Sequence, residues 1–496
     1  MKSNRRIFLK SSLASAAGMA VPMSTWCRAA GANGDLRIAV IGCNDPGKNP
    51  PGGRGRYHMK EIVGKMKHGG VRVAAICDVD STNLDGARAE LEKSQIKAEY
   101  YQDFRKLLES KEVDGVIIAT PNHTHSLIAA WALESGKHVY VEKPVSHNIW
   151  EGRQLSELAR KHSGKLVCQH GMQRRNDPVW EKVIEFVKSG KIGKPLLSRG
   201  LCYKTRPSIG QVGTPQPPPS TVEYDLWSGP RKPEPVPRKR LHYDWHWQWP
   251  WGNGDIGNQG PHQLDVARWL IGDPQELPAS VISIGGRFGY EDDATTANTQ
   301  IAYFDFKPVP IIFEVRGLPD ANLNFKGPMP VWRKTGVRVG NILHCEGGYI
   351  AEGIVYENGS DKVIDKSMRP NDGVGHQDKF FESMRSGKIA PTHQVLTGHL
   401  SAALAHMANI SYRLGREMGG AQAAETIKGN AEFSETCQRF LEHLQKNGIK
   451  TDEAKIVTGP MLAMDGRAEK FTGELADAAN NLATEDYREP FVMPKV

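Results

Sequence analysis

The residues best suited to chemistry lie in the short stretch GDIGNQGPHQLD, residues 254–265. Its glycines allow tight bends of the backbone, and His262 follows them where a helix is predicted to begin. Imidazole titrates near neutral pH, so His262 could accept a proton during a reaction. The alternative is a helix N-terminal residue that is hydrogen-bonded only for structure. Asn258 lies four positions earlier and would be the neighbour of such a base.

An aromatic cluster, HYDWHWQWPW (242–251), precedes this stretch. Indole faces stack on sugar rings, so the cluster indicates a carbohydrate site with Trp247 as one contact. The same alternation is also typical of a strand whose side chains belong to the core. The segment QRRN (173–176) adds polar groups, and Gln173 and Arg174 suit hydroxyls or a carboxylate.

A second group of glycines follows the apolar run LRIAVIGC (36–43), which predicts a buried parallel strand. Gly42, Gly52 and Gly55 fit the G-x-G-x-x-G turn that holds a dinucleotide pyrophosphate, with residues inserted after the first glycine. The turn needs bare backbone near the pyrophosphate and close packing of helix on strand. Interrupted in this way, the pattern is informative only together with its surroundings.

The next predicted strand, VRVAAICDVD (71–80), contains Asp78 near its end. A carboxylate there could accept both ribose hydroxyls of an adenosine and would repel a 2′-phosphate. The residue therefore favours NAD over NADP. Alternatively, Asp78 only caps the following helix.

Strands and helices alternate through the first part of the chain, with further strands predicted at 113–120 and 137–144. We therefore expect a doubly wound, Rossmann-type parallel sheet within residues 33–155, in an α/β protein. Later strands lack this rhythm and predict an α+β domain over 156–420 with an open, mostly antiparallel sheet. Residues 421–496 are expected to form an extension that packs on both domains. The proline-rich residues 205–240 are either an ordered loop beside the substrate cleft or a linker.

The motifs TPNHTH (120–125) and EKPVSHNIWEG (142–152) resemble the paired motifs of the Gfo/Idh/MocA oxidoreductase family. That family joins a Rossmann domain to a C-terminal α/β domain with an open sheet. The resemblance extends to GMQRRNDP (171–178), to the motif around His262 and to the tail 472–494.

The resemblance implies NAD as the cofactor, with NADP less favoured, and a small carbohydrate as the substrate. Lys143 would lie beside the substrate carbon that gives or takes hydride, where an ammonium stabilises an oxygen that gains negative charge. The alternative for Lys143 is a strand-end lysine in water. His262 would be the base, Asn258 would be a further catalytic residue, and both would contact the substrate. Lys143 would also belong to the cofactor pocket, together with further implied residues: Thr120, Pro121, Asn122, His125 and Glu142.

Asn258 departs from the family, which often has aspartate at this place. An amide cannot take a proton or balance the charge of Lys143, although Asp255 and Asp265 lie near enough in sequence to restore a carboxylate. Two alternatives to simple dehydrogenation therefore stay open. One is a glycoside hydrolase or lyase that works by transient oxidation and elimination. The other is a non-catalytic sugar-binding protein.

Composition and charge narrow the class of protein. At 496 residues, with 39% apolar and 24% charged residues, the chain is long enough for two or more globular domains. Its net charge of +8 is spread along the sequence, which argues against nucleic acid as a partner. The 7 cysteines are scattered without a CxxC pair, so neither a metal site nor a disulfide framework is expected.

The N-terminus predicts export. Arg5 and Arg6, a short apolar segment and the small residues near Ala30 and Ala32 are typical of a twin-arginine signal peptide over residues 1–32. The segment is too short and too polar for stable insertion in a membrane. We therefore expect a periplasmic or otherwise exported protein. From the family's open sheet we also expect a homo-oligomer, a dimer or a tetramer.

Overall fold

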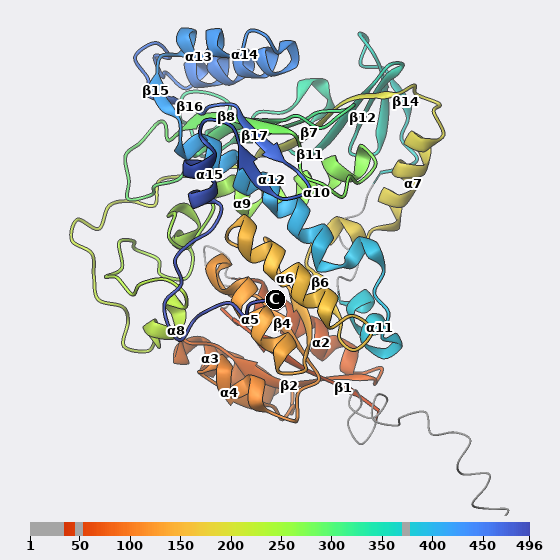
Figure 1. Cartoon of the computed structure of the whole chain (residues 1–496), viewed down its shortest axis with the longest axis vertical. Coiled ribbons are helices and arrows are strands. Elements are labelled where there is room, and N and C mark those ends of the chain that lie inside the picture. The colour runs from red at the N-terminus through yellow and green to blue at the C-terminus, as the bar shows by residue number, and fades with distance from the viewer. Residues whose placement is uncertain (1–33, 45–52, 370–376) are drawn as a thin grey trace, which may run out of the picture.

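The computed structural model describes residues 34–44, 53–369 and 377–496 of the chain. The first of its two sheets has six strands, all paired in parallel, in the order β3-β2-β1-β4-β5-β6 (Figure 1). This is the doubly wound Rossmann sheet that the sequence predicts. Its strands are β1 (Leu36–Ile41), β2 (Val71–Cys77), β3 (Glu99–Tyr101), β4 (Gly115–Ile118), β5 (His138–Val141) and β6 (Cys168–His170).

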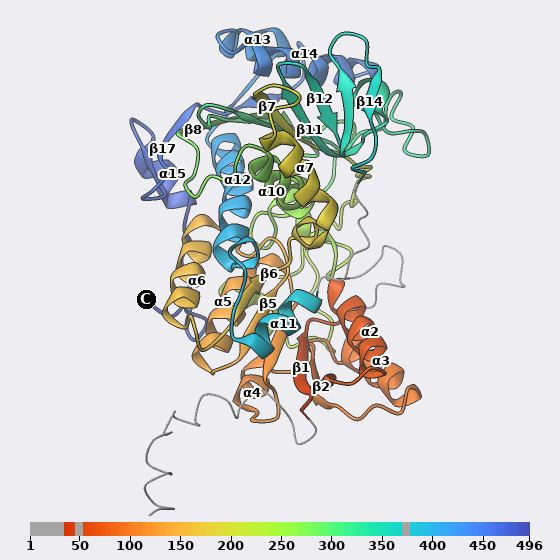
Figure 2. The same ribbon diagram turned by 90° about the vertical axis from the view of Figure 1, so that its right-hand side faces the viewer.

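Helices cover both faces of this sheet, as an all-parallel sheet requires. Ile38 and Val40 of β1 belong to the core formed with α2, α3 and α11. Ala39 and Ile41 point the other way, into the core formed with α4, α5 and α6. Figure 2 shows α11 against this sheet, although it follows most of the second domain in the chain. The helices are α2 (Arg54–Met66), α3 (Ser81–Lys93), α4 (Phe104–Glu109), α5 (Asn122–Glu134), α6 (Ile149–Lys161) and α11 (Asp378–Ser386).

The second sheet has twelve strands, and among the neighbours on its path only β7 and β10 pair in parallel within the described residues. The expected open, mostly antiparallel sheet is therefore confirmed. Its order is β14-β13-β12-β11-β7-β10-β9-β8-β16-β15, with β17 paired to β8 and β18. The strands are β7 (Pro195–Tyr203), β8 (Ser280–Gly286), β9 (Thr299–Phe304), β10 (Ile311–Arg316), β11 (Val339–Cys345), β12 (Gly348–Ala351), β13 (Ile354–Glu357), β14 (Val363–Asp365), β15 (Arg416–Met418), β16 (Ile456–Thr458), β17 (Leu462–Asp465) and β18 (Lys470–Thr472).

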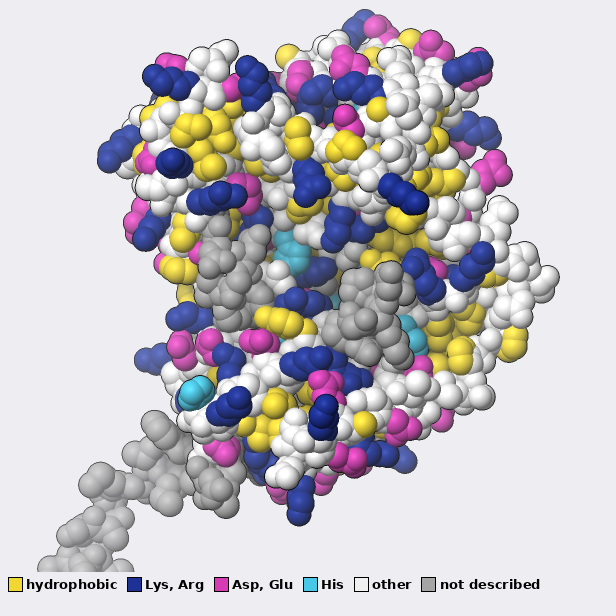
Figure 3. All heavy atoms as spheres, turned by 180° about the vertical axis from the view of Figure 1, so that it is seen from behind, with side chains coloured by type: hydrophobic (Ala, Val, Ile, Leu, Met, Phe, Trp, Pro, Cys, Tyr) yellow, Lys and Arg dark blue, Asp and Glu magenta, His cyan; other side chains and the backbone are white. Residues whose placement is uncertain are grey.

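Alternating residues again divide this sheet between two cores. Ala302 and Phe304 of β9 pack towards α10 and α12, whereas Ile301 and Tyr303 pack beneath α13 and α14. The helices of this domain are α7 (Pro178–Lys188), α8 (Tyr224–Ser228), α9 (Gly254–Asn258), α10 (Gly260–Leu270), α12 (Val395–Arg413), α13 (Gly420–Thr426), α14 (Ala431–Lys446) and α15 (Ala476–Leu482). From behind, the surface is hollowed between the two halves of the molecule, and Lys and Arg side chains gather around the hollow (Figure 3).

Two of the expected boundaries differ from the structure. Residue 155 falls inside α6, and the following strand β6 pairs with β5, so the N-terminal domain continues past it. Likewise β16, β17 and β18 of the predicted extension belong to the second sheet. The sequence of a short strand does not indicate which sheet the strand joins. Its backbone groups can pair with any sheet edge that has unpaired N–H and C=O groups.

The end of the chain returns to the N-terminal domain. Phe491 and Met493 lie in the core that α5 shares with the parallel sheet. The ring of Phe491 stacks on Trp131 with centroids 6.2 Å apart. The C-terminus therefore fixes the two domains to each other (Figure 1).

Residues 205–240 form an ordered loop, so the linker alternative is wrong. The Arg238 guanidinium lies between two indole rings, 4.7 Å from the centroid of Trp227 and 4.4 Å from that of Trp251. Val222 adds an isolated bridge to Asp80 of the N-terminal domain. These contacts hold the loop against the cavity described below.

The described cysteines are all buried and free, at positions 43, 77, 168, 202, 345 and 437. Cys27 and the predicted signal peptide lie outside the described residues. Within the described part of the chain, no helix combines the length and the apolar character needed to cross a membrane.

Candidate active site

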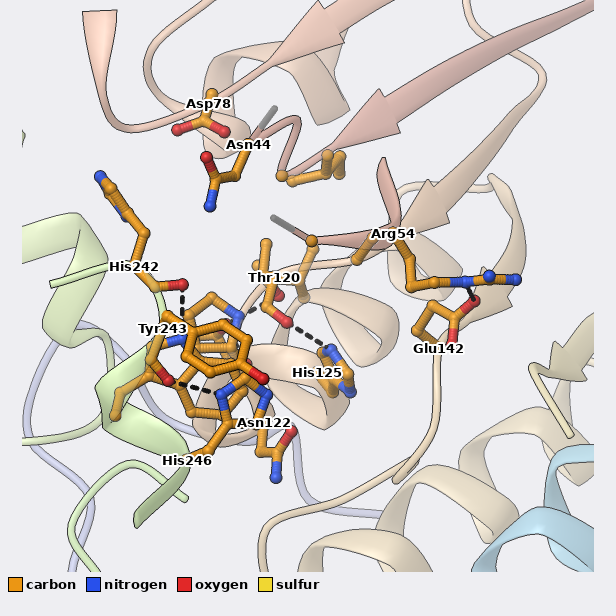
Figure 4. Close-up of a pocket in the computed structure, with 18 of the residues that line it drawn as sticks. Asn44, Arg54, Asp78, Thr120, Asn122, His125, Glu142, His242, Tyr243 and His246 are labelled. Carbon is orange, nitrogen blue, oxygen red and sulfur yellow. Dashed lines mark hydrogen bonds and ion pairs between the residues drawn. The ribbon is translucent and has the colours of Figure 1, made fainter. Parts of the chain in front are cut away.

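A cavity of ≈ 520 Å³ lies where the parallel strands β1, β2, β4 and β5 end, and segments of the C-terminal domain close its other side. Ligands of open α/β sheets bind in this crevice. In Figure 4, Asn44 and Asp78 lie at one end, and Arg54 and Glu142 lie away from them. Tyr243 contributes from the second domain. The cavity thus lies between the two domains.

Two glycines bring α2 close to the end of β1. Gly42 has a φ of 85°, and a Cβ there would lie 2.7 Å from the carbonyl oxygen of Ala119. A Cβ on Gly55 would lie 1.6 Å from the carbonyl oxygen of Gly42. Only glycine permits both approaches, which are those of a dinucleotide-binding turn. Gly42 lines the cavity, Gly55 does not, and Gly52 lies outside the described residues.

Asp78 lines the cavity at the end of β2. Its Oδ2 accepts a hydrogen bond from the backbone nitrogen of Cys43 at 2.7 Å, and its Oδ1 accepts one from that of Asp80 at 2.9 Å. The N-cap of α3 is Asp80, whose side chain accepts from the nitrogen of Thr82. The interpretation of Asp78 as a mere helix cap is therefore wrong.

Thr120, Pro121, Asn122 and His125 line the cavity between β4 and α5. Nδ1 of His125 lies 2.6 Å from the carbonyl oxygen of Pro144, and Nε2 lies 2.7 Å from that of Thr120. Burial lowers the pKa of His125, so the ring is neutral and donates to one of these oxygens at a time. The ring connects the end of β4 to the loop after β5.

Glu142 is a buried carboxylate at the end of β5, and it lines the cavity. Nε2 of His58 donates to its Oε1 at 2.8 Å, because Nδ1 of His58 accepts from the amide of Gln377 at 2.7 Å. Burial would raise the pKa of Glu142, but the bond from His58 and the charge of Arg54 outweigh burial. The pKa therefore lies well below its usual range, and the carboxylate stays ionised beside Lys143.

Lys143 extends across the cavity to α9. Its Nζ donates to the backbone oxygen of Asn258 at 2.5 Å and lies 3.4 Å from the side-chain oxygen. Burial lowers the pKa of Lys143 to about 8, and the charge of Glu142 partly offsets this effect. The alternative of a strand-end lysine in water does not fit this environment.

His262 lies on the first turn of α10 and lines the same cavity. Burial lowers its pKa well below the ordinary value, and the ammonium of Lys143 acts in the same direction. The imidazole is therefore neutral, as a proton acceptor must be, although its pKa is not near neutrality as the sequence suggested. Its buried Nδ1 has no hydrogen-bond partner among the described residues, which argues against a purely structural role.

Neither Asp255 nor Asp265 supplies the carboxylate that the amide of Asn258 lacks. Asp255 accepts a hydrogen bond from Nη2 of Arg206 at 2.6 Å. Asp265 accepts two from Arg175, each at 2.9 Å. Both charges are already balanced by guanidinium groups. The nearest oxygens to the Lys143 ammonium thus belong to a neutral residue.

Of the polar residues predicted for the substrate, Gln173 lines the cavity and Arg174 does not. Nη1 of Arg174 donates to Glu352 at 2.7 Å, and its guanidinium lies over the ring of Trp180. Other lining residues escaped the sequence analysis: Asn44, Arg54, Thr124, Lys204, Trp227 and His246. Lys204 could have been found from the sequence, because it directly follows the apolar run of β7.

The aromatic cluster contains a short 3₁₀ turn, η2 (Asp244–Trp247), and no strand. The core part of that alternative is confirmed, because Trp245, Trp247 and Trp251 are buried. Trp247 is buried beneath Arg206, whose guanidinium carbon lies 4.9 Å from the centroid of the Trp247 ring. Trp247 does not line the cavity. Tyr243, Trp245 and His246 line it instead. A turn rotates successive side chains by about 120°, which a period of two cannot anticipate. Within the described residues no group of three or more His, Cys, Asp or Glu could hold a metal ion.

Taken together, the parallel sheet, the glycine turn and Asp78 define a dinucleotide-binding Rossmann protein with a second, mostly antiparallel domain. The chain belongs to the Gfo/Idh/MocA oxidoreductase family. Residues 36–170 match the model of its NAD-binding Rossmann fold, and residues 179–328 match that of its C-terminal alpha/beta domain. The N-terminal domain is thus an NAD-binding domain, and its glycine turn and Asp78 fit that cofactor.

Similar proteins include dehydrogenases of cyclic polyols. The inositol 2-dehydrogenase of Salmonella paratyphi B is 32% identical over 162 residues, 33% of this chain and 46% of the relative. The scyllo-inositol 2-dehydrogenase (NAD(+)) of Bacillus subtilis is 31% identical over 165 residues, 33% of this chain and 44% of the relative. The chain therefore matches just under half the length of these relatives.

A solved structure has a similar fold. The WlbA dehydrogenase of Bordetella pertussis, in complex with NADH and UDP-GlcNAcA, superposes with a TM-score of 0.52 at 18% identity. The match covers 75% of this chain and 96% of that one.

Proposed function

We propose that the protein is an exported NAD-dependent dehydrogenase that oxidises a carbinol carbon of a sugar or sugar derivative and holds its cofactor tightly. The observation that carries this proposal is that Lys143 and His262 line one cavity with Gly42 and Asp78. The names of the inositol dehydrogenases support a polyol as substrate. A cofactor that is scarce outside the cytoplasm would be recycled by paired oxidation and reduction on the same protein.

Oxidation of an alcohol requires that the hydroxyl proton leaves as hydride departs. When bound, NAD supplies the hydride acceptor. The neutral imidazole of His262 accepts the hydroxyl proton. The ammonium of Lys143 stabilises the substrate oxygen as negative charge develops on it, and the oxygens of Asn258 hold that ammonium in place.

A second candidate function is favoured by Asn258, because its amide rather than a carboxylate lies beside the Lys143 ammonium. In it, a sugar carbon is oxidised transiently, the neighbouring C–H becomes acidic and a glycosidic bond breaks by elimination before re-reduction. Release of free sugar without net change in the redox state of the cofactor would distinguish this hydrolase or lyase from a dehydrogenase.

Cofactor content and turnover test the proposal together. The freshly purified protein is denatured, and the released small molecules are identified by mass spectrometry. We expect NAD at near-stoichiometric amounts, and we expect members of a sugar and polyol panel to reduce NAD to NADH. NAD without turnover or bond cleavage on any sugar would favour a non-catalytic sugar-binding protein. Absence of NAD, with no binding when it is added, would overturn the proposal.

The rate should fall at alkaline pH, because Lys143 acts as an ammonium. Its pKa is about 8, so the protonated form predominates below pH 8 and is lost as the pH rises through that value. A plot of log kcat/KM should therefore bend downward near pH 8. Asn258→Asp adds a negative charge beside Nζ and should move this bend to higher pH. A profile that is flat to pH 10, or no displacement in the variant, would contradict this role.

Selectivity between NAD and NADP should depend on Asp78. Asp78→Ala removes the charge that repels a 2′-phosphate, so the ratio of the Kd values for NADP and NAD should fall by about tenfold or more. Calorimetric titration with each nucleotide measures it. Asp103→Ala is the control: Asp103 caps α4 outside the cavity, so stability should fall by about 1 kcal/mol with the ratio unchanged. Equal ratios in Asp78→Ala and the wild type would contradict the assignment.

Export through the twin-arginine pathway rests on Arg5, Arg6 and the apolar segment after them. Such a route carries folded proteins, which suits a protein that must bind its cofactor before export. Fractionation of cells should place the protein in the periplasm, and Arg5→Lys with Arg6→Lys should retain it in the cytoplasm.

A homo-oligomer stays a prediction, and the structure restricts its geometry. Phe433 and Phe440 of α14 pack on the face formed by β8, β9 and β10. A partner that paired on this sheet would therefore have to use the part towards β14. Light scattering of the purified protein would give the number of subunits.

A further inference from the structure

A second cavity of ≈ 660 Å³ adjoins the candidate active site. It lies at the edge of the second sheet, where β7 and β12 end and β11 and β13 begin. Lys204 and Gln259 line both cavities. A substrate whose reacting carbon lies beside His262 could therefore extend past these two residues into the second cavity.

The second cavity carries cations without carboxylate partners. Lys204, Arg338 and Arg369 line it, and the described residues place no Asp or Glu oxygen within 4.0 Å of their charged nitrogens. All three side chains are exposed to solvent. Elsewhere in this protein guanidinium groups are commonly paired, as Arg175 and Arg206 are. Three unpaired cations around one cavity indicate a binding site for a negative group.

The carboxylate in this cavity does not neutralise them. Oε1 of Glu352 accepts from Nη1 of Arg174 at 2.7 Å and from the backbone nitrogen of Asn341 at 2.6 Å. Its charge is thus balanced by the guanidinium of Arg174, which does not line the cavity. The hydroxyl group of Tyr356, which also lines the cavity, adds a hydrogen-bond donor for an oxygen atom.

The two cavities are also linked electrostatically. The positive charge of Lys204 lowers the pKa of Lys143, so its field acts at the candidate reaction centre. An anion that neutralised Lys204 would weaken this effect. Figure 3 shows the Lys and Arg side chains around the hollow between the domains.

We infer that the second cavity binds an anionic substituent, a phosphate or a carboxylate, of the sugar whose carbinol reacts in the first cavity. This inference deepens the proposed function and rests on it for the position of the reacting carbon. The cations of the second cavity recognise the anionic substituent. The reaction in the first cavity is still oxidation of the carbinol carbon. The natural substrate is therefore a charged sugar rather than a neutral one.

Binding is measured first, since it does not require turnover. The NAD-loaded full-length protein is titrated calorimetrically with glucose, glucose 6-phosphate and glucuronate. The anionic sugars should bind about 10- to 100-fold more tightly than glucose, and added salt should reduce the difference. Tighter binding of the phosphate or of the uronate identifies which anion the cavity prefers. Equal binding of all three at low salt would overturn the inference.

A double variant tests the cavity itself. Arg338→Gln with Arg369→Gln should raise the Kd of the preferred anionic sugar about 10- to 100-fold while NAD binding and the Kd of glucose stay unchanged. The control is Lys326→Gln with Lys334→Gln, which removes the same charge from exposed residues outside the cavity. An equal loss in both double variants would show a general effect of net charge and would overturn the inference. Oxidation of neutral and charged sugars with equal KM would also overturn it, but would leave the dehydrogenase proposal standing.

Discussion

Replacing Lys143 with methionine is expected to lower kcat by about 10²- to 10³-fold, equivalent to about 2.7–4 kcal/mol of transition-state stabilisation. Methionine keeps an unbranched chain and removes the ammonium. The affected step is the development of negative charge on the substrate oxygen, so the loss should fall on kcat more than on KM. Initial rates of NAD reduction with a sugar that the wild-type enzyme oxidises, measured at pH 7 where Lys143 is protonated, give both constants.

Two further measurements separate this effect from a loss of structure. NAD affinity and the free energy of unfolding should stay near those of the wild type, because the main partners of Nζ are the oxygens of Asn258. Lys161→Met makes the same chemical change at an exposed position on α6 and should leave kcat unaltered. A Lys143→Met protein that keeps the wild-type kcat would remove Lys143 from the mechanism.

Gly55→Ala is expected to weaken NAD binding by at least 100-fold and to destabilise the fold by about 1–3 kcal/mol. The added Cβ would lie 1.6 Å from the carbonyl oxygen of Gly42 and 2.7 Å from its carbonyl carbon. Both are backbone atoms, so the start of α2 must move away from β1. That movement displaces the turn that faces the pyrophosphate. Calorimetric titration with NAD and denaturant unfolding measure the two effects.

Gly64→Ala is a matched control on the same helix. A Cβ at Gly64 would meet no atom within 4 Å, and alanine has the higher helix propensity. This variant should bind NAD as the wild type does and be more stable by about 0.5–1 kcal/mol. Similar NAD affinities in Gly55→Ala and Gly64→Ala would mean that the close approach of α2 to β1 does not matter for the cofactor.

Local sequence patterns were sufficient to predict the part of the site that the N-terminal domain provides. The apolar runs that end at Cys43 and Asp78 mark two strands, and the ends of neighbouring parallel strands must meet at one edge of a sheet. Lys143 follows a third such strand. The sequence therefore brings Gly42, Asp78 and Lys143 to one edge, where the cavity lies.

The residues that face the substrate part of the cavity are determined by contacts between segments distant in the sequence. The alternating aromatics predict Trp247 as a sugar contact, yet a 3₁₀ turn places it under Arg206 and directs Tyr243 to the cavity. Arg174 is held by Glu352, far along the chain. Periodicity describes only which residues share a side of one element, and it does not specify the partner that each side chain meets.

The sequence by itself determined the class of fold, the positions of Lys143 and His262 at the ends of regular elements, and the carboxylate suited to a ribose. Tertiary structure decided the protonation of the site. Burial, together with the positive charges of Arg54 and Lys204, lowers the pKa of Lys143 to about 8. Burial and the ammonium of Lys143 lower the pKa of His262 well below its ordinary value. Among the described residues, the same long-range packing leaves Lys204, Arg338 and Arg369 without carboxylate partners around one cavity. Charge and burial depend on distances in space, and distances in space are fixed only when the two domains pack together.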